Sequence, residues 1–139
     1  MKKIIYFIEF ILVYIFFIIF KILGYKASSN LGFVIGKTLG PIFRSKSLIV
    51  NNLKKSKINL KNNNYEIAKN VLGNYGRIFA EYPHLQSFRN NKLNRFIKVD
   101  GSEHLEKIKK NNKPVVFVSG HFNNFELMAM QIEKSGINL

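Results

Sequence analysis

The stretch VVFVSGHFNNFELMAMQIEKSG, from Val115 to Gly136, decides which fold the sequence predicts. Its first four residues are apolar and mostly β-branched, which is typical of a short buried strand. Ser119 and Gly120 break this pattern, and a helical pattern then runs from about Phe125 to Ser135. Gly136 follows as a suitable left-handed stop. We therefore expect a strand, a loop and a helix in succession.

The loop of this unit carries the residues with chemical potential. His121 follows Gly120 directly, and either Asn123 or Asn124 is expected to cap the helix with its side chain. Open α/β sheets bind their ligands at the carboxyl ends of strands, where His121 is expected to lie. Glu126 comes five positions later, in the first helical turn, where the helix dipole favours a carboxylate.

His121 and Glu126 form a candidate catalytic dyad. An imidazole becomes a directed general base when a carboxylate holds one ring nitrogen and the other faces a substrate hydroxyl. Such a dyad needs no serine or cysteine nucleophile if the acyl donor is already a thioester. A histidine and a glutamate at this spacing also occur often by chance, so a purely structural role for His121 stays open.

The residues upstream extend the predicted sheet. Residues 95–99 are a strand candidate, and residues 102–110 are predicted to form a short helix, on which His104 is a surface or packing residue. Together with the strand at Val115 they predict a parallel strand–helix–strand unit with a right-handed crossover. The predicted fold class is therefore α/β.

The amino-terminal segment is a candidate membrane anchor. Ile4–Leu23 is apolar apart from Glu9 and Lys21, and reaches about the 20 residues that cross a hydrocarbon core. A cleaved signal peptide is the alternative, with Ala27-Ser28-Ser29 as its possible processing region.

Small residues and basic residues dominate the next segment. Ser28, Gly32, Gly36 and Gly40 recur every four residues, which predicts a helix with one smooth face, lying at the membrane or against the first helix. A glycine-rich loop is the alternative. Beyond Pro41 we expect an amphipathic basic surface suited to anionic headgroups, or else an ordinary exposed helix. Its basic residues are Arg44, Lys46, Lys54, Lys55, Lys57 and Lys61.

A further helix is expected between a polar cap at residues 61–64 and Pro83. Its apolar residues follow helical spacing, and two glycines within it indicate tight packing. Glu81 and His84, near its end, are interpreted as surface or capping groups rather than as site residues.

The net charge of +14 favours acidic partners. Only three lysines and one glutamate lie in residues 1–25, so most of the positive excess lies beyond the anchor. The chain has no cysteine, which excludes disulfides and thiolate metal sites, and its three scattered histidines do not predict a metal site. No cofactor is expected.

Two blocks of the sequence resemble a known family. GHFNNFE, at residues 120–126, is similar to the GHFGNWE-type block of the bacterial lipid A late acyltransferases, the lauroyl and myristoyl transferases. VDGSEHL, at residues 99–105, is similar to the family's lead-in block. Asn123 replaces the usual glycine and Phe125 the usual tryptophan.

The resemblance implies transfer of a fatty acyl group from acyl carrier protein to a lipid A precursor. His121 would be the base and Glu126 its partner, with Gly120, Asn124 and Phe125 in substrate binding. We also expect a bacterial inner-membrane protein. The basic residues downstream of the anchor favour a catalytic body on the cytoplasmic side, and they suit anionic membrane lipid as a partner. No nucleic acid is expected as a partner.

Family members are longer, so we expect a transmembrane anchor at residues 1–25 and a partial, truncated α/β domain of the glycerolipid-acyltransferase kind at residues 26–139. One alternative is a glycerophospholipid acyltransferase, against which Gly120 and Glu126 argue. Another is an inactive membrane-tethered fragment that binds anionic lipid.

Overall fold

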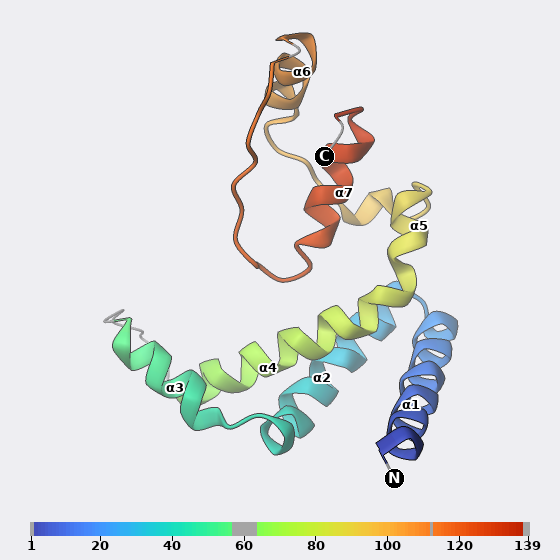
Figure 1. Ribbon diagram of the computed structural model, residues 1–139, viewed down its shortest axis with the longest axis vertical. Helices are drawn as coiled ribbons and strands as arrows, with labels where there is room; N and C mark the ends of the chain where they lie inside the picture. The colour runs from blue at the N-terminus through green and yellow to red at the C-terminus, as the bar shows by residue number, and fades with distance from the viewer. Residues whose placement is uncertain (1, 57–63, 112, 138–139) are drawn as a thin grey trace. The chain divides into compact units, whose positions relative to one another are not determined.

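The computed structural model describes residues 2–56, 64–111 and 113–137, apart from the side chain of Lys46. The chain divides into two compact units, Met1–His84 and Leu85–Leu139. The first unit contains helices α1 (Lys2–Leu23), α2 (Tyr25–Phe43), α3 (Lys46–Lys55) and α4 (Asn64–Glu81), and the 3₁₀ turn η1 (Tyr82–His84) (Figure 1). The second contains α5 (Leu85–Arg89), the 3₁₀ turn η2 (Asn94–Phe96), α6 (Ser102–Asn111) and α7 (Glu126–Lys134).

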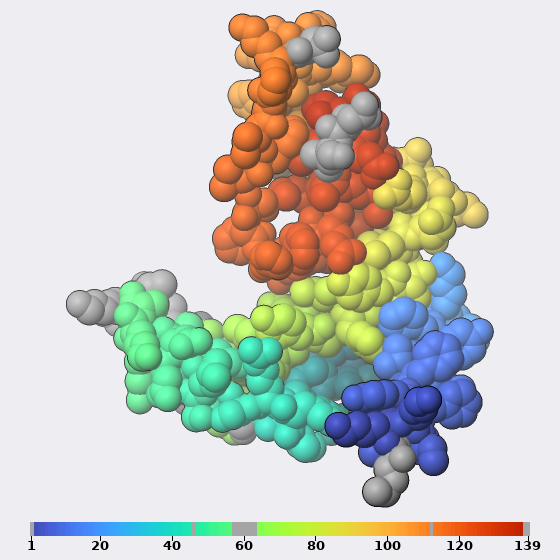
Figure 2. All heavy atoms as spheres, viewed as in Figure 1, coloured from blue at the N-terminus to red at the C-terminus, as the bar shows by residue number. Residues whose placement is uncertain are grey.

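The prediction of an α/β fold is wrong, because the described residues form helices and loops and no strand. The predicted first strand begins in η2 and continues as irregular chain. The segment 113–120 is irregular too, and within it Val116 and Val118 are 86% and 91% exposed. Figure 2 shows an opening between part of this orange segment and the red α7. A strand needs backbone partners along its edge, and neither segment pairs with the other.

The helical predictions are confirmed with small shifts at their ends. The predicted glycine-striped helix is α2, the helix expected before Pro83 is α4, and the short helix after residue 101 is α6. The basic segment beyond Pro41 contains α3, while Lys57, Lys61 and the polar cap expected at residues 61–63 lie outside the described residues.

Helices α2 and α4 pack backbone to backbone through their glycines. A Cβ atom added to Gly76 would collide with the carbonyl oxygen of Gly32, and one added to Gly36 would lie 2.5 Å from the carbonyl oxygen of Leu72. On Gly40 the added atom would lie 2.9 Å from the Leu72 Cβ. The smooth stripe of α2 therefore lies against α4, which the sequence did not name as its partner.

Helix α1 is long and apolar enough to cross a membrane, by its length and composition. Most of its side chains are exposed, and Phe20 is its buried residue. The Phe79 ring of α4 lies 5.3 Å from the Phe17 ring and 6.3 Å from the Phe20 ring, centroid to centroid. Helix α1 thus contacts the rest of its unit near its carboxyl end and leaves its remaining surface to its surroundings.

A buried polar cluster fixes the carboxyl end of α1. The Ser28 hydroxyl donates to the carbonyl oxygen of Phe20 at 2.5 Å, and the His84 Nε2 lies 3.1 Å from the same oxygen. The last carbonyls of a helix lack intrahelical donors, so these side chains supply what the end of α1 needs. Lys21 Nζ adds a bond to the carbonyl oxygen of Pro83 at 2.7 Å. We use the name α1 joint for the polar contacts around this helix end, which involve Phe20, Lys21, Ser28, Ser29, Arg77, Glu81, Pro83 and His84.

The expectation that Glu81 and His84 lie on the surface is wrong, because they are 5% and 4% exposed. His84 does act as a capping group, but at the end of α1 rather than of its own helix. The Ser29 hydroxyl donates to Glu81 Oε1 at 2.7 Å, and Arg77 Nη1 donates to the Ser29 oxygen at 3.1 Å. Ionisable groups are buried here because each has a polar partner in the joint.

We predict that Gly76→Ala destabilises the protein. Alanine favours a helix over glycine by about 1 kcal/mol, but the added methyl group would overlap the Gly32 carbonyl, and overpacking costs about 1–3 kcal/mol. Chemical unfolding in detergent, followed by circular dichroism, measures the effect. Asn70→Ala, at an exposed position of α4, is the matched control and should change stability by less than about 0.5 kcal/mol. An unchanged or raised stability of Gly76→Ala would contradict the close contact.

We also predict that His84 makes stability depend on pH. Burial first, then the charge of Lys21, holds the pKa of His84 below 6.5, so the folded state binds this proton less readily than the unfolded state. Its contribution is full above pH 6.5 and is lost as pH falls from there through the lowered folded pKa. His84→Gln should flatten that part of the unfolding profile, whereas His104→Gln, at an exposed position, should retain it. Equal slopes for the two variants would refute this assignment.

Candidate active site

The site predicted from sequence lies at the amino end of α7. The N-cap residue of α7 is Phe125, so the prediction that Asn123 or Asn124 caps this helix is wrong. The carbonyl oxygen of Asn124 accepts from the Leu127 amide at 3.2 Å, and Asn123 turns the chain with a φ of 45°. At the other end Ser135 is the C-cap, and Gly136 has a φ of 85°, as the predicted left-handed stop requires.

His121 lies exposed on the loop before α7. Its ring centroid lies 4.3 Å from that of Phe125, with the two planes inclined by 61°. The amide of Phe122 donates to the carbonyl oxygen of Gly120 at 2.9 Å, which tightens the loop on either side of the histidine. The aromatic contact places the imidazole beside Phe125, the N-cap residue of α7, which directly precedes Glu126 in the sequence.

Glu126 and Phe125 line a cavity of about 400 Å³ between α5 and α7. On α7 the lining residues recur every three to four positions, so they occupy one face of the helix. The other members of the lining are Leu85, Gln86, Arg89, Ala129, Met130 and Glu133. The structure therefore brings Phe125 and Glu126 into one cavity, with His121 beside its Phe125 wall. The pairing of His121 with Glu126 stays a prediction.

A second cavity, of about 500 Å³, lies on another side of α7. Leu127, Met128, Gln131 and Ile132 contribute to it from α7, and the chain from Phe96 to Gly101 contributes from η2 and the loop after it. Most of these α7 and loop side chains are apolar. Helix α7 thus separates the cavity that Glu126 lines from a second cavity lined by other residues of the same helix.

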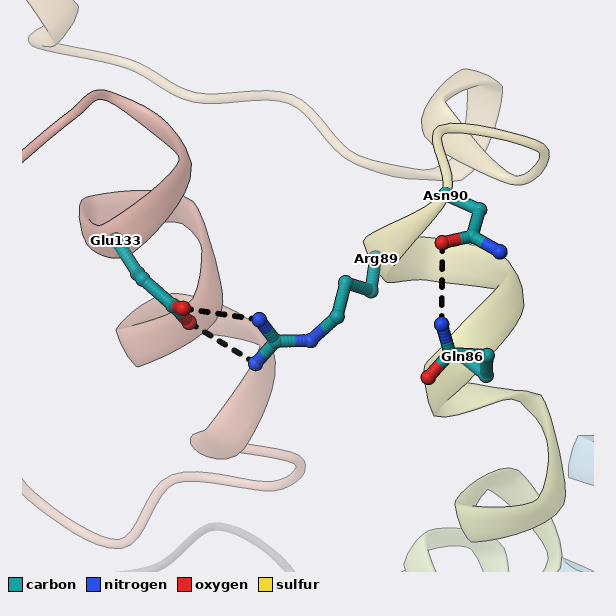
Figure 3. Close-up of polar contacts among 4 residues, drawn as sticks. All are labelled: Gln86, Arg89, Asn90 and Glu133. Atoms are coloured by element: carbon teal, nitrogen blue, oxygen red, sulfur yellow. Dashed lines mark hydrogen bonds and ion pairs between the residues drawn. The ribbon is translucent and has the colours of Figure 1, made fainter.

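Two basic residues tie α5 and the residues after it to α7. Arg89 Nη1 and Nη2 donate to the two carboxylate oxygens of Glu133, each at 2.9 Å, in the forked geometry that Figure 3 shows. Lys134 Nζ donates to the carbonyl oxygen of Phe88 at 3.1 Å and to Asn94 Oδ1 at 3.3 Å. Phe88 itself is fully buried. Of these residues, Arg89 and Glu133 line the Glu126 cavity.

Comparison with known proteins adds the family. The family model of the bacterial lipid A biosynthesis acyltransferases matches residues 1–139, which is the whole chain. This chain belongs to that family. Searches of curated proteins and of solved structures found no match.

As a lipid A biosynthesis acyltransferase, the chain is a member of a family of enzymes that transfer acyl groups in lipid A synthesis. Their substrates are an acyl donor and a lipid acceptor. The family and the apolar α1 together indicate association with a membrane. Residues 2–56, 64–111 and 113–137 contain no group of three or more histidine and acidic residues placed to hold a metal ion.

The sequence reasoning missed the Arg89–Glu133 contact. The two residues are 44 positions apart and lie on different helices, so no local spacing signals the pair. The burial of Glu81 was also missed, because its partner Ser29 is 52 positions away in the chain. One local signal was available: Arg77 lies four positions before Glu81, a spacing at which two charges on a helix can pair.

We predict that Arg89→Gln raises the pKa of Glu133 towards its ordinary value. The hydrogen bonds and then the positive charge of Arg89 hold that pKa below 4.5 in the folded chain. Carboxyl-carbon NMR titration of Glu133 in both proteins measures the change. The control is Lys98→Gln, which removes the exposed partner of Asp100 and should leave the pKa of Glu133 where it is in the wild type. If the Glu133 pKa were the same in the wild type and Arg89→Gln, the forked pair would not persist in solution.

Proposed function

We propose that this acyltransferase moves a fatty acyl group from acyl carrier protein to a hydroxyl of a lipid A precursor, with His121 as general base and Glu126 as its partner. The observation that carries the proposal is the placement of the GHFNNFE block: Glu126 lies in a cavity wall in the first turn of α7, and His121 packs against the neighbouring Phe125. The family match supports acyl transfer as the reaction.

The proposed chemistry follows from these positions. The acceptor hydroxyl attacks the thioester carbonyl while His121 takes its proton. The tetrahedral intermediate then collapses, the carbon–sulfur bond breaks, and the imidazolium returns the proton to the departing thiolate. Glu126 stabilises the imidazolium that forms when His121 takes the proton. Packing against Phe125 restricts the orientations of the imidazole ring.

The neighbouring residues are assigned to substrate binding. Gly120 presents bare backbone beside His121, and a Cβ there would lie 2.6 Å from the Phe122 ring. Asn124 is half-buried at the start of α7, and Phe125 offers an apolar ring to the same cavity as Glu126. These three residues would position the reacting groups beside His121.

The membrane arrangement is part of the proposal. Residues 1–25 anchor the chain in the bacterial inner membrane, and residues 26–139 form the acyltransferase part on the cytoplasmic side, where acyl carrier protein is found. Arg44, Lys54 and Lys55 provide positive charge for anionic headgroups. The net charge of +14 also suits an acidic carrier protein.

We predict that His121 and Glu126 act as one catalytic unit. His121→Ala should lower transfer per folded molecule by about 10²–10⁴-fold, because a positioned general base contributes that much. Glu126→Gln should also lower it, and the double variant should be scarcely slower than His121→Ala, because residues that act together are strongly non-additive. The measurement is thioester consumption with a lipid A precursor present, normalised to folded protein.

Two controls accompany this assay. His104→Ala, at an exposed histidine of α6, should leave transfer unchanged. Acyl-coenzyme A in place of acyl carrier protein tests the donor, and equal rates with the two thioesters would reject carrier-protein specificity alone. Near-normal turnover of His121→Ala would reject the general base, and lost thermal stability in that variant would then assign His121 a structural role.

A further inference from the structure

Besides the glycine stripe that packs on α4, helix α2 has a largely exposed face that the catalytic proposal does not use. Leu31, Val34, Ile35, Thr38 and Ile42 recur at spacings of three and four residues, so they form one stripe along the helix. Val34 and Ile42 are 55% and 76% exposed. This stripe, which we call the α2 apolar stripe, is distinct from the glycine stripe that packs on α4.

The one polar side chain in the α2 apolar stripe does not need water. The Thr38 hydroxyl donates to the carbonyl oxygens of Val34 and Ile35, at 2.8 and 3.2 Å. A hydroxyl satisfied by its own helix backbone is suited to an apolar medium, where an unsatisfied donor would be costly. The charge of Lys37 lies elsewhere on the helix, where its Nζ is 3.7 Å from Glu66 Oε2 of α4.

We propose that the α2 apolar stripe lies in the lipid bilayer, so that α2 is a second, interfacial membrane helix beside α1. Gly24 alone separates the two helices, so α2 begins where the candidate membrane span of α1 ends. Phe43, at the end of α2, is a further exposed apolar side chain, 86% exposed. The inference goes beyond the catalytic proposal and does not depend on the dyad.

The charges that follow α2 favour a bilayer over a protein as the occupant. Arg44 comes directly after α2, and Lys54 and Lys55 lie in the last turn of α3. An apolar stripe followed by cations is the pattern of helices that lie at an anionic membrane surface. Leu48 of α3, 50% exposed, adds an apolar side chain between these cations.

The absence of cysteine from the chain allows a direct test. Val34→Cys and Ile42→Cys would each carry an environment-sensitive fluorophore in protein reconstituted into vesicles of phosphatidylcholine and phosphatidylglycerol. Phe10→Cys, in the middle of α1, is the control for membrane insertion, and Asn70→Cys, at an exposed position of α4, is the control for water. Aqueous iodide and lipids brominated along their acyl chains are the two quenchers.

The proposal requires that both stripe labels be quenched by the brominated lipids and be several-fold less sensitive to iodide than the Asn70 label. Their quenching should be strongest with bromine near the headgroup, whereas the Phe10 label should respond to deeper bromine. All four positions are exposed, so circular dichroism should show the same helix content in every variant.

Three results would overturn the proposal in different ways. Stripe labels as accessible to iodide as the Asn70 label would place α2 in water. Stripe labels protected from both quenchers would show that a protein surface, including a second copy of this chain, covers them. A Phe10 label open to iodide would show that α1 does not enter the bilayer. Helix α2 could then not be a second membrane helix beside α1.

Discussion

The contact between the backbones of α2 and α4 is the constraint on which the first unit depends. Glycine in a helix interior costs about 1 kcal/mol relative to alanine, and α2 contains three glycines and α4 two. The compensation is close approach, because the Gly32 carbonyl occupies the space that a side chain on Gly76 would need. Dispersion between closely packed backbones replaces the usual interlocking of large side chains.

This contact also positions what is attached to the two helices. The carboxyl end of α4 brings Glu81 and η1 beside the amino end of α2, where Ser28 and Ser29 lie. In the described part of the chain, these two serines with Glu81 and His84 are the buried polar and charged residues. The α1 joint therefore concentrates the polar interior of the unit at the carboxyl end of α1. Losing one member would leave its buried partners unsatisfied, which is costlier than losing an exposed bond.

In the second unit, α7 connects local sequence to the proposed chemistry. Its amino end carries Glu126, and seven positions later Glu133 forms the forked contact with Arg89 of α5. The same face of α7 therefore carries a candidate catalytic carboxylate and the contact that holds α5 against it. Because the Arg89–Glu133 pair is exposed, it adds little to the free energy of unfolding, and its main effect is to orient α5 against α7. The family match supplies the reaction class that this face is proposed to serve.

Local sequence signals were enough to predict most of the helices and to name the candidate residues. Helical periodicity and end signals are local, so α1, α2, α4, α6 and α7 could be placed to within a few residues, and Gly136 could be identified as a stop. The motif around His121 and Glu126 could be named from the chain alone, and it resembles the family that the whole-chain match then showed.

The contacts between these elements could be learned only from the three-dimensional arrangement of the chain. The apolar run at Val115 predicted a strand, but a strand is completed by hydrogen bonds to another segment, and its own residues cannot supply them. The partner of the α2 glycines, the burial of Glu81 and His84, and the cavity beside Glu126 all depend on residues far apart in the chain. Local sequence determined these helices because their backbone bonds close within each segment, whereas burial and pairing depend on which distant surface arrives.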